Sequence, residues 1–211
     1  MIDLYCERTG ADFWAEPLNA VTNLAFIIAA VAILWQALRS QTLQLDLGVL
    51  IGLLFMIGIG SGLFHLFATR ETMLADVLPI LGFQVVFLLT YGRRVIGLSG
   101  GGCFRLFMMY VLLTILCSYL PSSWLNGTLS YAPAFMFLLG FGVYHYVTRQ
   151  PMPFVLLTAA GIFLVSMTFR SIDQSVCQDI PIGTHFLWHI FNALVLYLCL
   201  YSLILKQKSI S

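Results

Sequence analysis

Hydrophobic and polar positions alternate along this chain in long blocks rather than in the short periods of a soluble protein. Seven apolar blocks, each about as long as a helix that crosses the hydrocarbon core of a membrane, are separated by short polar segments. They are Ala20–Leu38, Leu47–Phe67, Met73–Tyr91, Phe104–Leu120, Leu129–Val147, Phe154–Phe169 and Gly183–Leu205. Because these blocks are too long and too uniformly apolar for barrel strands, they predict an all-α membrane protein, a seven-transmembrane helix bundle.

Composition supports this class and excludes others. Only 9% of the 211 residues are charged, against about 25% in soluble domains. The net charge of +1 gives no basic surface for nucleic acid. With no internal repeat or linker, we expect one domain over residues 1–211 and see no protein partner. Residues 1–19 form an acidic N-terminal segment without the basic region of a signal peptide.

The basic residues near the ends of the blocks predict the orientation of the bundle. With the N-terminus outside and the C-terminus in the cytoplasm, seven basic residues face inward and three outward. The inner set is Arg39, Arg93, Arg94, Arg105, Arg149, Lys206 and Lys208, and the outer set is Arg8, Arg70 and Arg170. Nearly all carboxylates then lie at the outer end, where they form either a solvated rim or cation sites.

Three of the four histidines fall at one depth near the outer end. His185 and His189 form an i, i+4 pair on one helix face, and His65 lies near the outer end of the second block. His145 belongs to the inner end of the fifth block, so we exclude it. A lone histidine near a helix end is usually a hydrogen-bonded interfacial residue, whereas three at one depth favour a shared metal site.

Ser61 and Asp76 accompany these histidines, and each has two interpretations. Ser61 shares a helix face with His65, but its glycine neighbours also suit close packing of helices. Asp76 stands near the start of the third block, where it either favours the helix dipole or serves as a general base. Arg170 and Asp173 precede the seventh block, and we assign them structural roles.

At this point the chain resembles a known family. S-G-L-F-H from Ser61, D-V-L-P-I from Asp76 and G-T-H-F-L-W-H from Gly183 are similar to three signature blocks of the alkaline ceramidases. These belong to a superfamily of seven-span membrane proteins that also includes the adiponectin and progestin receptors. The resemblance extends over nearly the whole chain and keeps the order of the motifs.

The resemblance implies a site and a reaction. It implies a zinc ion held by His65, His185 and His189, with Asp76 as the base that acts on the zinc-bound water. It implies that Ser61 steadies the developing oxyanion. The function expected from it is zinc-dependent hydrolysis of the amide of ceramide, or a related N-acyl lipid, to a fatty acid and a long-chain amine. The alternatives are a receptor-like protein with a structural zinc and a lipid esterase.

The acidic N-terminal segment also matches the family, although less closely. The resemblance implies a calcium site there, for which Asp3, Glu7 and Glu16 are the candidate ligands, while a solvated acidic tail is the alternative. Topology places Cys6 and Cys177 together on the outer side, where both a disulfide and two free thiols are compatible with their spacing. The resemblance implies that the two cysteines form a disulfide.

Overall fold

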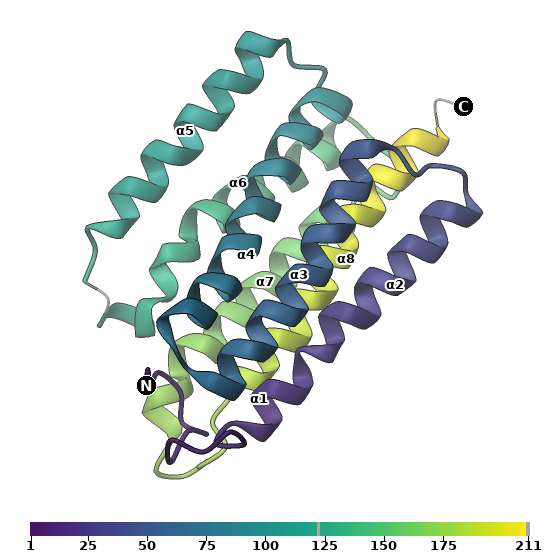
Figure 1. Ribbon diagram of the computed structural model, residues 1–211. Coiled ribbons are helices and arrows are strands. Elements are labelled where there is room, and N and C mark those ends of the chain that lie inside the picture. The colour runs from purple at the N-terminus through teal and green to yellow at the C-terminus, as the bar shows by residue number, and fades with distance from the viewer. Residues whose placement is uncertain (122, 210–211) are drawn as a thin grey trace.

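The computed structural model describes residues 1–121 and 123–209, and every regular element in these ranges is a helix (Figure 1). Within the described part of the chain, seven helical segments are long and apolar enough to span a membrane. They are Pro17–Arg39, Leu45–Phe67, Arg70–Ile96, Gly100–Ser118, Trp124–Val147, Val155–Val176 and His185–Lys208. The prediction of an all-helical, multi-pass membrane protein is therefore confirmed, and each expected block overlaps one observed span.

Four of the seven spans combine two helical elements. These are α1 (Pro17–Thr22) with α2 (Leu24–Arg39), α4 (Arg70–Tyr91) with the π-helical turn η1 (Gly92–Ile96), η2 (Trp124–Tyr131) with α6 (Ala132–Val147), and α7 (Val155–Ile172) with η3 (Asp173–Val176). The other three are single helices, namely α3 (Leu45–Phe67), α5 (Gly100–Ser118) and α8 (His185–Lys208).

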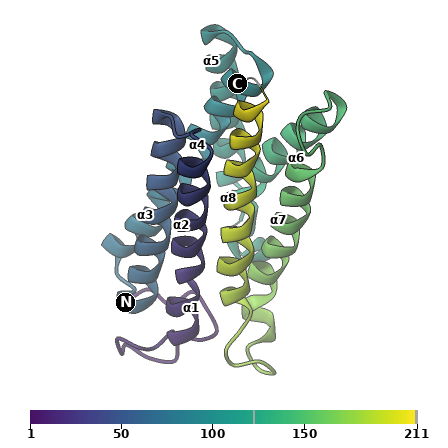
Figure 2. The same ribbon diagram turned by 90° about the vertical axis from the view of Figure 1, so that its right-hand side faces the viewer.

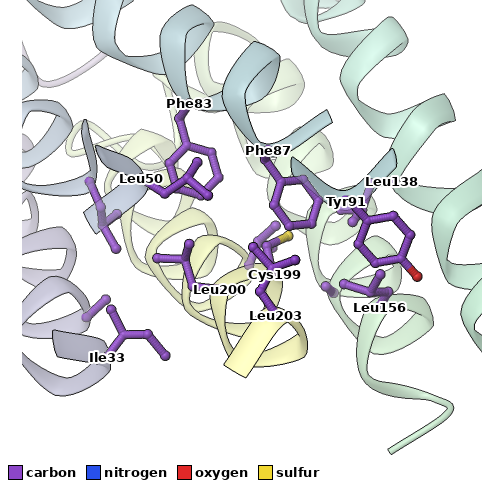
Figure 3. Close-up of a cluster of buried hydrophobic side chains, with 14 of the residues drawn as sticks. Ile33, Leu50, Phe83, Phe87, Tyr91, Leu138, Leu156, Cys199, Leu200 and Leu203 are labelled. Atoms are coloured by element: carbon purple, nitrogen blue, oxygen red, sulfur yellow. The ribbon is translucent and has the colours of Figure 1, made fainter. Parts of the chain in front are cut away.

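The helices pack around one apolar core. In Figure 2, α8 lies between α2 and α7, while Figure 1 shows α5 at the edge of the bundle. Figure 3 shows Phe83 and Phe87 of α4 in one cluster with Leu200 of α8 and Leu138 of α6. Since lipid tails are as apolar as these side chains, close packing rather than exclusion of water holds such helices together.

One end of the bundle gathers three segments that are far apart in the sequence. The N-terminal segment, the turn between α3 and α4, and the loop between α7 and α8 lie together there, opposite the C-terminus (Figures 1 and 2). The Ile2 amide donates to the Ala68 carbonyl at 2.8 Å, and the Gln174 side chain donates to the Leu4 carbonyl at 2.8 Å. A Cys6–Cys177 disulfide closes this end, which confirms the pairing that the family resemblance implied.

Candidate metal centre

Three buried histidines meet at this closed end. His65 comes from the last turn of α3, and His185 and His189 come from the first two turns of α8. Each offers one ring nitrogen, and these atoms lie within 4.8 Å of one another. The Nε2 atoms of His65 and His189 are 3.1 Å apart. Tetrahedral zinc would hold two such nitrogens about 3.3 Å apart, so this pair has the spacing of two zinc ligands.

Hydrogen bonds on the far side fix the orientation of two of the rings. His65 Nδ1 lies 2.5 Å from a carboxylate oxygen of Glu16, and His189 Nδ1 lies 2.9 Å from the Thr22 hydroxyl. The Thr22 hydroxyl donates to the Leu18 carbonyl at 2.8 Å, so its lone pair accepts from His189. Metal-binding histidines commonly hold their second nitrogen in this way, which leaves Nε2 free for the metal.

The third ring is held differently. His185 stacks on Tyr5 of the N-terminal segment, with ring centroids 3.6 Å apart. Its Nδ1 atom is buried and has no hydrogen-bond partner among the described residues. Buried polar atoms almost always have a partner, so this atom calls for one. A metal ion in the cluster is a chemically suitable partner, and three imidazoles with one open position are typical of catalytic zinc.

Asp173 fixes the start of α8, from which two of the histidines project. Its carboxylate accepts from the amides of Thr184 at 2.6 Å, His185 at 2.9 Å and Cys6 at 3.1 Å. A β-carbon at Gly183, which has φ of +63°, would lie 2.2 Å from Asp173 Oδ1. The glycine of the G-T-H motif therefore allows this approach, and Asp173 has the structural role predicted for it.

A backbone contact between α3 and α4 brings Ser61 and Asp76 together. A β-carbon at Gly60 would lie only 2.0 Å from the Ala75 carbonyl oxygen, so only glycine permits this approach. Pro79 lies inside α4 and has no N–H, so it cannot donate to the carbonyl four residues earlier, which is that of Ala75. The packing role considered for the glycines is confirmed at Gly60, and the same contact places Asp76 beside Ser61.

The Asp76 carboxylate faces the cluster. Its side chain has Ser61, the His65 ring and the Arg170 guanidinium as neighbours. Because α4 begins at Arg70, Asp76 lies beyond the first turn. The helix dipole acts mainly within the first turn, so a dipole role for this residue is not supported.

Arg170 is held on the other side of the same space. Its guanidinium lies over the rings of Tyr5, Tyr131 and Trp188, with distances to the ring centroids of 6.0, 5.5 and 5.6 Å. It also donates to the Asn126 carbonyl at 2.5 Å. Arg170 thus joins η2 to α7 and α8 and gives Asp76 a cationic neighbour.

The carboxylates considered for calcium have other partners. Glu7 accepts from the amides of Leu18 at 2.7 Å and Asn19 at 2.8 Å, which caps the start of α1, and Asp3 is exposed. Burial raises the pKa of Glu7 above its usual range, against the effect of these two amides. Glu16 is hydrogen-bonded to Asn19 at 3.0 Å, as well as to His65 and to Arg8.

Burial by itself also raises the pKa of Glu16, but its hydrogen bonds outweigh that effect and hold the pKa below its usual range. Sequence reasoning missed the contact of Glu16 with a histidine of the cluster. It also missed Arg8 and Thr22, which complete the surroundings of the rings. Of these three residues, only Arg8 could have been singled out from the sequence, because it is the one basic residue in the acidic segment before the first span.

Comparison with known proteins gives one family. A model of the family described as Ceramidase matches residues 4–209, which is nearly the whole chain and includes every residue of the site. A search of curated proteins returns no match. The match exceeds half of the chain by a wide margin and agrees with the motifs around Ser61, Asp76 and Gly183. This chain therefore belongs to the Ceramidase family.

Proposed function

We propose that this protein is a zinc-dependent amidase of the membrane. It hydrolyses the amide of ceramide, or of a related N-acyl lipid, to a fatty acid and a long-chain amine. One observation carries the proposal. The nitrogens of three buried histidines lie within 4.8 Å of one another, with Asp76 and Ser61 beside them, in a chain of the Ceramidase family.

The residues present fit zinc. His65, His185 and His189 would hold the ion, which when bound polarises a carbonyl and lowers the pKa of water toward about 7. We do not extend the proposal to calcium, because each carboxylate oxygen of Glu7 and Glu16 already has a donor within the protein.

Asp76 and Ser61 supply the rest of the chemistry. Asp76 takes a proton from the attacking water while the water oxygen bonds to the amide carbon. The Ser61 hydroxyl donates to the carbonyl oxygen, where negative charge develops. Asp76 then passes the proton to the leaving nitrogen as the carbon–nitrogen bond breaks. The products are a carboxylic acid and an amine, and Asp76 is returned to its starting state.

An apolar cavity next to the cluster supports a lipid substrate. Trp188 forms part of its wall, and the same ring stacks near that of His185, with centroids 6.5 Å apart. From there the lining continues through Phe83 and Phe87 to Cys199, three residues that Figure 3 labels. A long hydrocarbon chain suits this lining, with its amide at the polar end beside the histidines.

The orientation belongs to the same proposal. With the N-terminus outside, the metal centre lies in the outer half of the membrane, where a disulfide persists. A tag placed after the last residue should react with antibody only after cells are permeabilised. Reaction in intact cells would contradict this orientation.

Mass spectrometry of lipids tests the activity. Purified protein incubated with ceramide should release fatty acid and sphingoid base in equal amounts. Asp76→Asn should keep its zinc yet lose about 100-fold or more of the turnover, since general acid–base catalysis contributes that much. His189→Ala should lose both. Release of product from an ester analogue alone would identify an esterase, and unchanged turnover in a zinc-free His189→Ala protein would refute the mechanism.

A further inference from the structure

Arg8 is a buried cation beside the metal centre. Only 5% of the residue is exposed, although it lies in a segment otherwise rich in acids. Its Nε pairs with Glu16, and both side chains are almost fully enclosed. A buried charge is costly unless it is paired and hydrogen-bonded, so this arginine and this carboxylate depend on each other.

Arg8, Glu16 and His65 are joined in a closed cycle of hydrogen bonds. One terminal nitrogen of Arg8 donates to the His65 carbonyl at 2.7 Å. Because α3 ends at Phe67, that carbonyl is among those with no partner inside the helix. Glu16 meanwhile holds the His65 ring through Nδ1. The backbone and the ring of one histidine are thus held by a single salt-bridged pair.

Each carboxylate oxygen of Glu16 has a hydrogen-bond partner within the protein. One oxygen pairs with Arg8, and the other lies 2.5 Å from His65 Nδ1 and 3.0 Å from the Asn19 side-chain nitrogen. Calcium requires six to eight oxygen ligands, and here a guanidinium already neutralises the carboxylate. A cation is therefore present at this position as part of the chain.

We propose that Arg8 is the resident cation of the acidic N-terminal segment and a positioning residue for the metal ligand His65. It acts through Glu16 on the ring and directly on the carbonyl. This inference rests on the proposed metal centre. Arginine suits the role because its planar fork reaches two acceptors at once, whereas a lysine ammonium acts as a point charge.

Metal release tests the proposal. Zinc transfer from purified protein to a colorimetric chelator should be about 10–100-fold faster in Arg8→Met, which is the usual effect of removing an outer partner of a metal ligand. Arg8→Lys should restore part of this loss. Arg39→Met is the matched control, because Arg39 is exposed at the far end of α2 and should leave the rate unchanged. An unchanged rate in Arg8→Met would overturn the proposal.

A spectrum separates positioning from general destabilisation. With cobalt in place of zinc, the visible absorption of Arg8→Met should shift, because the ring of His65 has lost its orientation, while that of Arg39→Met should not. If Arg8→Met fails to fold, Glu16→Gln and Arg8→Lys carry the same test, and wild-type spectra and release rates in both would overturn the proposal.

Further measurements distinguish a failure of this inference from a failure of the proposed amidase function. The melting temperature of wild-type protein should be the same in calcium as in magnesium. A rise that is specific to calcium would overturn the role of Arg8 as resident cation. Wild-type protein that binds neither zinc nor cobalt would refute the proposed function itself. Wild-type binding with no change in any Arg8 or Glu16 variant would refute this inference alone.

Discussion

Two sites with buried histidines differ in one respect. At the end of the bundle near the C-terminus, both ring nitrogens of His145 have partners, the Tyr91 hydroxyl at 2.8 Å and the Pro151 carbonyl at 3.0 Å. At the opposite end, which the disulfide closes, His65 and His189 each use Nδ1 for a protein partner and turn Nε2 toward each other. Burial is common to both sites, so it does not distinguish them. What distinguishes the candidate metal centre is a set of nitrogens that the protein leaves available.

The largest effect should come from exchanging one histidine at each site for glutamine. His185→Gln should lose bound zinc and at least about 1,000-fold of the amidase activity, because the metal contributes several kcal/mol to the transition state. His145→Gln should keep both, since both of its ring nitrogens are already hydrogen-bonded within the protein. Zinc content per protein and initial rates measure the contrast. Equal losses in the two variants would remove the distinction between the sites.

A smaller effect should follow from adding a methyl group at the close contact between α3 and α4. Gly60→Ala places a methyl group against the Ala75 carbonyl, so the helices must separate and Asp76 must move away from Ser61. We expect a loss of about 1–3 kcal/mol in the free energy of unfolding, with a lower kcat. Gly52→Ala is the control on the same helix, because a β-carbon there meets nothing within 4 Å. Equal melting temperatures and rates for both variants would contradict this account.

The smallest effect should come from Tyr91→Phe at the His145 site. This change removes the hydroxyl bonded to His145 and should cost about 1 kcal/mol of stability, the usual value for one hydrogen bond. Zinc content and turnover should not change, because the His145 site lies at the opposite end of the bundle from the proposed metal centre. Thermal unfolding together with a zinc assay measures both quantities. A loss of zinc would mean that the two ends of the bundle are coupled.

Much of the candidate metal centre was predictable because its residues lie on helices. The i, i+4 spacing of His185 and His189 fixes their common face, and span topology fixes the depth of His65. The partners of the rings were not predictable in the same way. Glu16 and Arg8 belong to a segment before the first span, which has no periodicity that determines where it folds. The sequence therefore led us to consider Glu16 for calcium, whereas the structure places it against His65.

The sequence by itself determined the seven spans, their order and the candidate ligands, because hydrophobic length and helical spacing are local properties of the chain. Only the tertiary structure decided which atoms meet. The closeness of α3 to α4 depends on Gly60 opposite Ala75, and the start of α8 depends on Asp173 beside Gly183. The pairing of Arg8 with Glu16 depends on the N-terminal segment lying over the end of α3. Such contacts join residues that are distant in sequence. The free energy of each contact depends on the residues that surround it in the folded protein, which a local sequence pattern does not specify.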